Sequence, residues 1–224
     1  MSHLLVATST TKDGNMYNRH DPTDQSVIKN RRAFLKKHGI SMQHSSRVRV
    51  NYDGDNFCRY ITIDDSRKGH GMLDSAIEPA DALIITRPNH ALILPVADCI
   101  ATVIYDPEHS VLMVSHLGRH SLEQHGAQKS IEYLVGHFES DPSQLQIYLS
   151  PSASKENYPI WALNNMGLKE AAHQQLTTAG ISPQNINDNT AETDKDPLYY
   201  SYSEYQKGRQ SEDADFMVVA MIND

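Results

Sequence analysis

A cysteine and the histidines that follow it are the residues of this sequence best suited to chemistry. Cys99 is one of only two cysteines in the chain. The sequence Asp-Pro-Glu-His at 106–109 has the composition of a type I turn, with Pro at the second position. If these four residues form the loop of a hairpin, Tyr105 faces Ser110 and Cys99 lies directly opposite His116. Facing Cβ atoms of an antiparallel pair are about 4.5–5.5 Å apart, so this turn predicts that a thiol and an imidazole meet.

A cysteine beside a histidine supports two kinds of chemistry. A thiol acts as a nucleophile or a metal ligand only as thiolate, and a nearby imidazolium or metal lowers its pKa. Asp98 is a candidate for orienting a ring nitrogen, or else it caps a strand end. His116 and His120 are four residues apart, which brings them together if a helix begins early enough, and one cysteine with two histidines forms a zinc site with an open fourth position. A buried, structural Cys99 is the alternative, because free cysteines are among the most buried residues.

The elements that must position these residues are predicted by periodicity. Alternating or continuous apolar residues predict strands on both sides of the 106–109 turn and at 4–8, 47–52, 57–63, 81–86, 91–96, 145–149 and 215–222. The strands 81–86 and 91–96 are expected to pair like a hairpin. Apolar residues at helical spacing predict helices from Asp21-Pro22 to just before Gly39, from 121 to 138 and from 168 to 179. Hairpins mixed with single helices are typical of α+β proteins.

Composition narrows the class of protein. With 224 residues, the chain can bury a substantial core in one large domain or two joined halves. A net charge of −8 argues against nucleic acid as a partner. The N-terminal residues lack the basic start and apolar core of a signal peptide, and no apolar run approaches the ~18 residues of a membrane span. Two cysteines do not make a disulfide framework. We therefore expect a soluble, cytoplasmic protein with no nucleic-acid or membrane partner.

Several short motifs occur in the order that one protein family shows. Val96-Ala97-Asp98-Cys99-Ile100, then Tyr105-Asp106-Pro107 and Ser115-His116-Leu117-Gly118 resemble the signature of the YfiH-like family, also called the laccase-domain or multicopper polyphenol oxidoreductase family. The family pattern there is T-A-D-C-x-P, an aspartate turn and A-H-A-G-W-R-G. Further family motifs are matched along nearly the whole chain by Asn30-Arg31-Arg32, Ala80-Asp81-Ala82-Leu83, Ser150-Pro151-Ser152-Ala153 with Tyr158, Tyr200-Ser201-Tyr202 and Gly208-Arg209.

This resemblance implies a fold, a metal and a class of substrate. The fold would be a single domain, residues 1–224, of packed mixed β-sheets with flanking helices in an α/β/β/α-like order, shared distantly with cysteine-dependent toxins of the CNF type and with deamidases. Family members hold zinc, or copper in some reports, through a His, a Cys and a second His, and Cys99 and His116 match the last two. The activity ascribed to the family is phosphorolysis of purine nucleosides and deamination of adenosine.

The sequence departs from the family pattern at the first metal ligand. Counting without gaps from the motif of the first helix places that histidine on Asn51. His120, at the position of the arginine in G-W-R-G, becomes the candidate third ligand. By the same resemblance, Asn51, Arg119, Tyr202 and Arg209 are candidate substrate-binding residues.

Three functions are compatible with these residues. The first is a zinc-dependent (rather than copper-dependent) purine nucleoside phosphorylase or adenosine deaminase, whose partners are a purine nucleoside and phosphate and whose site contains Cys99, His116 and Asp98. The second is a metal-free hydrolase or amidase, in which Cys99 is the nucleophile, His116 the base and Asn51 a donor to the oxyanion. The third is a non-catalytic member of the family that binds a nucleotide or a protein.

Overall fold

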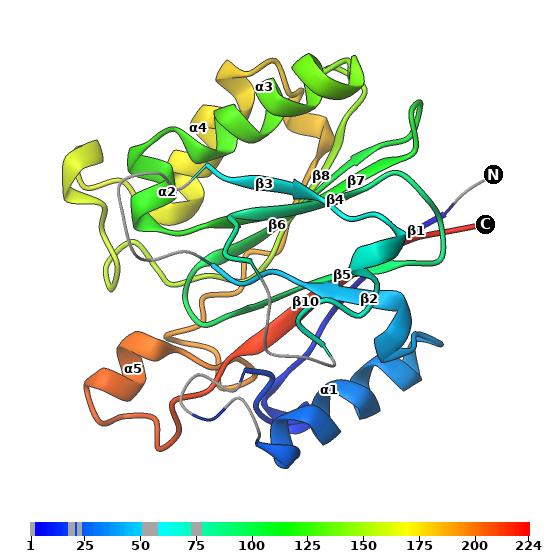
Figure 1. Cartoon of the computed structure of the whole chain (residues 1–224). Coiled ribbons are helices and arrows are strands. Elements are labelled where there is room, and N and C mark those ends of the chain that lie inside the picture. Colours follow the sequence, from blue (N-terminus) through cyan, green and yellow to red (C-terminus); the bar gives the residue numbers. More distant parts are fainter. Residues whose placement is uncertain (1–2, 18–20, 22–23, 51–57, 73–77) are drawn as a thin grey trace.

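Two mixed β-sheets form the centre of the molecule, in a computed structural model that describes residues 3–17, 21, 24–50, 58–72 and 78–224. The strand order is β1-β10-β5-β2 in the four-stranded sheet and β3-β4-β7-β6-β8-β9 in the six-stranded sheet (Figure 1). The first sheet contains β1 (His3–Thr8), β2 (Ser45–Arg47), β5 (Ala91–Val96) and β10 (Phe216–Asn223). The second contains β3 (Tyr60–Thr62), β4 (Ala82–Ile85), β6 (Ile100–Asp106), β7 (Val111–Leu117), β8 (Gln146–Leu149) and β9 (Ile186–Asp188).

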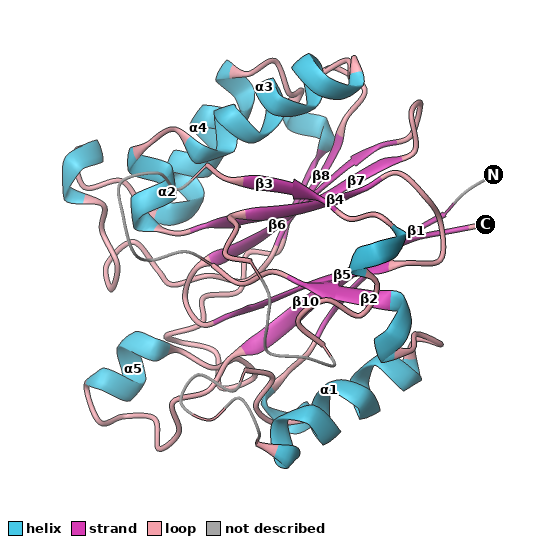
Figure 2. Cartoon of the chain, viewed as in Figure 1, coloured by secondary structure: helices cyan, strands magenta, loops and turns pink. Residues whose placement is uncertain are grey.

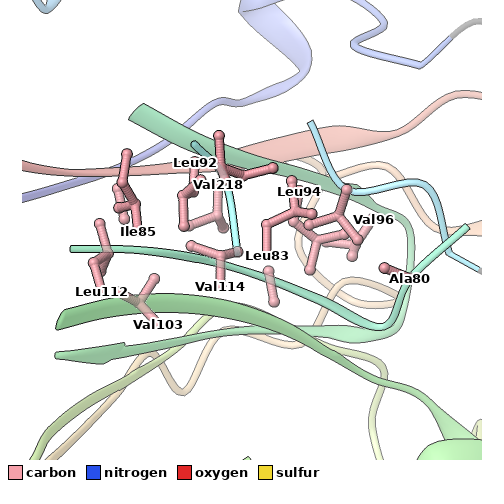
Figure 3. Packing of buried hydrophobic residues seen from close by; sticks show 14 of the residues in the cluster. Ala80, Leu83, Ile85, Leu92, Leu94, Val96, Val103, Leu112, Val114 and Val218 are labelled. Carbon is pink, nitrogen blue, oxygen red and sulfur yellow. The ribbon is translucent and has the colours of Figure 1, made fainter. Parts of the chain in front are cut away.

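Helices cover the outer faces of the two packed sheets (Figure 2). On the four-stranded sheet lies α1 (Gln25–Lys37), and on the six-stranded sheet lie α2 (Arg119–Glu123), α3 (Gly126–Phe138) and α4 (Leu168–Thr178). Apolar side chains from both sheets fill the space between them, among them Leu83 and Val114 from one sheet and Leu92 and Val218 from the other (Figure 3). This arrangement confirms the predicted α+β fold with its α/β/β/α order of layers.

The strands that lead to Cys99 and His116 are covered on both faces. Every residue of β5, β6 and β7 is buried, which explains why these strands are nearly continuous apolar runs. The chain passes from the four-stranded to the six-stranded sheet between β5 and β6. The prediction that 81–86 and 91–96 pair like a hairpin is wrong, because β4 and β5 belong to different sheets. Apolarity alone does not distinguish strands that pair edge to edge from strands that pack face to face.

The β6–β7 hairpin forms as predicted, but its register differs by two residues. Tyr105 pairs with Leu112 and Ala101 pairs with His116. Cys99 is therefore not directly opposite His116. Side chains alternate between the faces of a sheet with a period of two, so a shift of two residues keeps both side chains on the same face.

Asp106 accounts for the difference in register. Its Oδ1 accepts hydrogen bonds from the backbone amides of Glu108 and His109, at 2.9 and 3.1 Å. These bonds close the turn while Asp106 itself stays in β6 and pairs with Val111. The loop is therefore 107–110, and not the predicted 106–109.

The other predicted elements are mostly in place but differ at their ends. The helix α1 begins later than the predicted start at Asp21-Pro22. Its N-cap is Asp24, whose carboxylate accepts a hydrogen bond from the Ser26 amide. The predicted helix 121–138 is interrupted by His125, which has a left-handed φ of 60°. The sequence predicts neither β9 nor the short α5 (Tyr202–Gln206). The predicted strand 47–52 is wrong where it can be compared, because β2 ends at Arg47, and residues 51–57 lie outside the described residues.

In the described part of the chain, no helix combines the length and apolarity needed to cross a membrane.

Candidate active site around Cys99 and His116

Cys99 follows a tight turn at the crossing between the sheets. It lies between the end of β5 and the start of β6. The preceding residue, Asp98, is buried and has a left-handed φ of 79°, a conformation that costs energy for a residue other than glycine. Such local strain persists only where surrounding contacts hold the backbone in place.

Three hydrogen bonds hold Asp98. Its Oδ1 accepts from the Thr193 hydroxyl and its Oδ2 from the Ser203 amide, both at 2.7 Å. Its carbonyl oxygen accepts from the Ala153 amide at 2.9 Å. Asp98 therefore ties the turn before Cys99 to three other segments of the chain. Since both carboxylate oxygens are engaged in this way, Asp98 anchors the backbone of Cys99.

His116 is the penultimate residue of β7 and is 4% exposed. Its backbone amide donates to the carbonyl oxygen of Asp81 at 2.8 Å, and on the other side it pairs with Ala101 of β6. Burial lowers the pKa of the His116 imidazole from 6.5 to about 4. The ring is therefore neutral at neutral pH, and one ring nitrogen carries a lone pair that can accept a proton or bind a metal.

Gly118 shows that the two side chains border the same space. A Cβ atom placed on Gly118 would lie 2.9 Å from the Sγ of Cys99 and 2.9 Å from the Cε1 of His116. The φ of Gly118 is −105°, which any L-residue adopts, so the backbone does not require glycine here. The glycine leaves room in which a thiol and a neutral imidazole approach one point from two strands.

Tyr158 is a further residue of this region. Burial raises the pKa of Tyr158 to about 12, and the nearby groups of Cys99, Asp98 and Glu123 act in the same direction. Arg119 acts against them and favours the ionised phenol. The Tyr158 hydroxyl is thus within electrostatic reach of the thiol and of a positive charge. The sequence motif that contains Tyr158 was a signal for this position, although periodicity gives it no role.

One family model matches this chain over the segment that carries the site. It is described as "Multi-copper polyphenol oxidoreductase laccase", and it matches residues 6–165, which include Cys99 and His116. The chain belongs to this family. The resemblance that the sequence motifs indicated is therefore confirmed.

Two solved structures share the fold. The hypothetical protein YfiH of Bacillus licheniformis matches with a TM-score of 0.87 and 18% identity, over 98% of this chain and 93% of that chain. YlmD from Geobacillus stearothermophilus matches with a TM-score of 0.81 and 17% identity, over 100% of this chain and 92% of that chain. At these identities the likeness concerns the fold, and it confirms the predicted fold class.

One curated relative carries an enzyme name. It is a purine nucleoside phosphorylase of Corynebacterium glutamicum, which is 26% identical over 136 residues. These residues are 61% of this chain and 52% of that protein. The chain thus spans about half the length of the curated relative that it matches.

His120 does not share a helical turn with His116, contrary to the geometry expected from their spacing. His116 is in β7, and α2 begins only at Arg119. The His120 side chain is 50% exposed and contacts two neighbours on the same helix. Its Nε2 is 3.3 Å from the Nη2 of Arg119, and its Nδ1 is 3.9 Å from the Oε2 of Glu123. The i,i+4 argument fails because the helix begins three residues too late.

The other candidate substrate-binding residues come from separate segments of the chain. Arg119 begins α2, one residue after Gly118. Tyr202 begins α5 and is 39% exposed. Arg209 binds the carboxylate of Glu204 with both Nε and Nη2, the latter at 2.6 Å. Asn51 lies outside the described residues.

The described residues do not form a complete metal centre. A catalytic zinc ion is held by three protein ligands and keeps one open position. Cys99 and His116 are ligands of the right type, but they are two. Among the residues that the structure describes, no three His, Cys, Asp or Glu side chains come close enough to hold a metal ion.

Proposed function

We propose that this protein is an enzyme that cleaves purine nucleosides with phosphate, and that Cys99 and His116 form the centre of its active site. The observation that carries the proposal is the approach of the Cys99 thiol and the neutral His116 ring to one point beside Gly118. It is supported by membership of a family in which a relative is called a purine nucleoside phosphorylase.

The reaction needs a positive charge and a proton donor. A phosphate oxygen forms a bond to the ribose C1′ while the bond from C1′ to the purine nitrogen breaks, and the leaving base takes up the proton that the hydrogen phosphate gives up. Arg119 directly follows Gly118, and its positive charge favours the ionised form of the Tyr158 phenol, which supports its role as the cation of this region. A guanidinium binds phosphate through paired N–H donors. We therefore assign phosphate binding to Arg119, with Cys99 and His116 facing the nucleoside.

Zinc is the metal that we propose for this site, with Cys99 and His116 as two of its ligands. A third ligand would have to come from outside the described residues or from a rearrangement of α2, since the described residues supply only two. The step described above uses side chains of the chain alone and does not depend on this third ligand.

A second function is favoured by the turn before Cys99. The left-handed Asp98 presents the thiol at the start of a strand, and strained residues of this kind cluster at active sites. In this alternative Cys99 attacks a carbonyl carbon as a thiolate, and His116 takes the thiol proton. The bond from the carbonyl carbon to the amine or alcohol then breaks, and the leaving group departs with the proton held by His116. Water hydrolyses the remaining acyl-enzyme and regenerates the thiol.

Turnover of nucleosides tests the proposal. The protein is purified without a histidine tag and incubated with adenosine, inosine or guanosine, with and without phosphate. Chromatography measures the free base, ribose 1-phosphate and deamination products. We expect phosphate-dependent release of the base, and its loss in Cys99→Ala. Cys58→Ser is the matched control, because Cys58 is the only other cysteine, and it should keep its activity.

The outcomes separate the functions. Inosine formed from adenosine without phosphate would indicate deamination instead of phosphorolysis. Absence of turnover with all three nucleosides at high enzyme concentration would reject the proposal. Elemental analysis is expected to find zinc in the wild type and a loss of zinc in Cys99→Ala. A metal-free protein whose Cys99 is alkylated rapidly at neutral pH would favour the second function.

A further inference from the structure

Asp81 is a buried carboxylate at the edge of this site. The proposed reaction assigns it no role. It directly precedes β4 and is 1% exposed. Its Oδ2 accepts a hydrogen bond from the backbone amide of Arg59 at 3.0 Å. Its Oδ1 is buried and has no hydrogen-bond partner within the described part of the chain. An unsatisfied buried carboxylate oxygen is costly, so a donor that completes it is expected nearby.

The register of the sheet places His116 directly opposite Asp81. The β4–β7 pairing brings Ala82 opposite Ser115, and the bond from the His116 amide to the Asp81 carbonyl continues it by one residue. Asp81 and His116 are thus directly opposed in an antiparallel pair. Their Cβ atoms are expected about 4.5–5.5 Å apart on the same face of the sheet.

The two oxygens of Asp81 are oriented by neighbouring strands. In the sheet, β4 lies between β3 and β7. Arg59, which holds Oδ2, directly precedes β3, whereas His116 belongs to β7 on the other side. The carboxylate therefore has one oxygen fixed by the segment before β3, while the second oxygen has no partner among the described residues and β7 is the neighbour on the other side.

We propose that Asp81 is a positioning residue for His116: its Oδ1 accepts a hydrogen bond from a ring N–H of His116 in the working site. A change of side-chain torsion completes this bond. A carboxylate that accepts from one ring nitrogen fixes the tautomer, so the lone pair resides on the other nitrogen. That nitrogen then faces Cys99 and the space beside Gly118.

The role is the same whether His116 binds a metal or takes a proton. Histidine ligands of metals donate their second ring N–H to a carboxylate or a carbonyl, and loss of this partner costs about 10–100-fold in metal affinity or activity. A histidine that serves as a base for a nucleophile is held in its tautomer in the same way. The inference rests on the proposed site but not on the identity of the substrate.

The tautomer of His116 can be measured directly. Long-range correlation of ring ¹H and ¹⁵N in labelled, chelator-treated protein at pH 7.5 shows which nitrogen carries the proton when no metal fixes it, and His116→Asn assigns the signals. We expect a single tautomer in the wild type. In Asp81→Asn, the amide oxygen keeps the bond from the Arg59 amide and the NH₂ group faces the ring as a donor. The His116 tautomer should therefore reverse, and turnover should fall about 10–100-fold.

Asp106→Asn is the matched control. Asp106 is equally buried in the same sheet, at the far end of β6, and its substitution should leave the His116 signals unchanged. An unchanged tautomer in Asp81→Asn would overturn the inference. If Asp81→Asn does not fold, the spectrum of the wild type still tests the inference. A fast-exchanging mixture of the two His116 tautomers in the wild type would overturn the inference as well. The spectra are recorded without substrate. The tautomer of His116 can therefore be determined even if the protein turns over no nucleoside.

Discussion

The space beside Gly118 gives a direct test of the site by a single added methyl group. In Gly118→Ala the new Cβ would lie 2.9 Å from the Cys99 Sγ and from the His116 Cε1, and 3.4 Å from the His116 Nε2. Carbon atoms in contact are normally about 3.5–4.0 Å apart. Both the thiol and the ring must therefore move by roughly 0.5–1 Å, or the backbone of Gly118 must shift away from them, to admit the methyl group.

Neither neighbour moves easily. The backbone before Cys99 is held by the three hydrogen bonds of Asp98. His116 is buried and fixed on both sides by strand pairing. Overpacking of a tight site costs about 1–3 kcal/mol. A displacement of about 1 Å in an active site lowers turnover about 100-fold. The substitution should thus lower both stability and activity.

Urea unfolding, the rate of alkylation of Cys99 in a Cys58→Ser background and nucleoside turnover measure these effects. Gly136→Ala is the matched control. Gly136 lies in α3 with nothing within 4 Å of an added Cβ, so alanine there should be neutral or stabilise by up to about 1 kcal/mol. A Gly118→Ala variant with wild-type stability, alkylation rate and turnover would refute the convergence of Cys99 and His116.

Two further substitutions test the surroundings. Asp98→Ala removes the acceptor of the buried Thr193 hydroxyl and the Ser203 amide, so the free energy of unfolding should fall by about 2 kcal/mol or more; urea unfolding measures it, and a change below about 0.5 kcal/mol would contradict the anchoring role. His90 is buried, and burial, followed by the charge of Arg87, lowers its pKa from 6.5 to about 4. The unfolded chain takes up a proton near pH 6.5 and the folded chain only near 4, so stability is lost as pH falls through this window. Between pH 7 and 5 the wild type should lose about 2 kcal/mol more than His90→Gln, and equal losses would contradict the assignment.

The face on which Cys99 and His116 meet could be predicted from the sequence, although the pairing itself could not. The turn composition at 106–109 located the hairpin, and the apolar runs located its strands. The turn begins one residue later because Asp106 caps it from within β6. A shift by one residue on each strand changes the register by two, so both side chains remain on the face towards the other sheet. A shift of one would have separated them.

The partners of the site could not be read from local patterns. Asp81 stands opposite His116 because β4 pairs with β7, and this pairing joins residues that are 27 to 33 positions apart in the chain. The sequence favours β4 as a partner of β5 instead, since those two are neighbours along the chain. Tyr158 comes from a loop without periodicity. Only the order of the family motifs indicated Tyr158. The order of motifs does not predict which side chains Tyr158 approaches.

Gly118 contributes to the site in three ways. Its amide donates to the hydroxyl of Ser121 and so caps α2. It also precedes Arg119, and it leaves room for the thiol and the ring. If the end of β7 were extended or α2 began earlier, His120 could approach His116, but the chain around Gly118 would then leave the place that it occupies beside Cys99. The residue at which α2 begins therefore determines three things at once. These are the distance of His120 from His116, the position of Arg119, and the approach of Cys99 to His116. Because α2 begins only at Arg119, a third metal ligand from this helix requires a different path of the chain after β7.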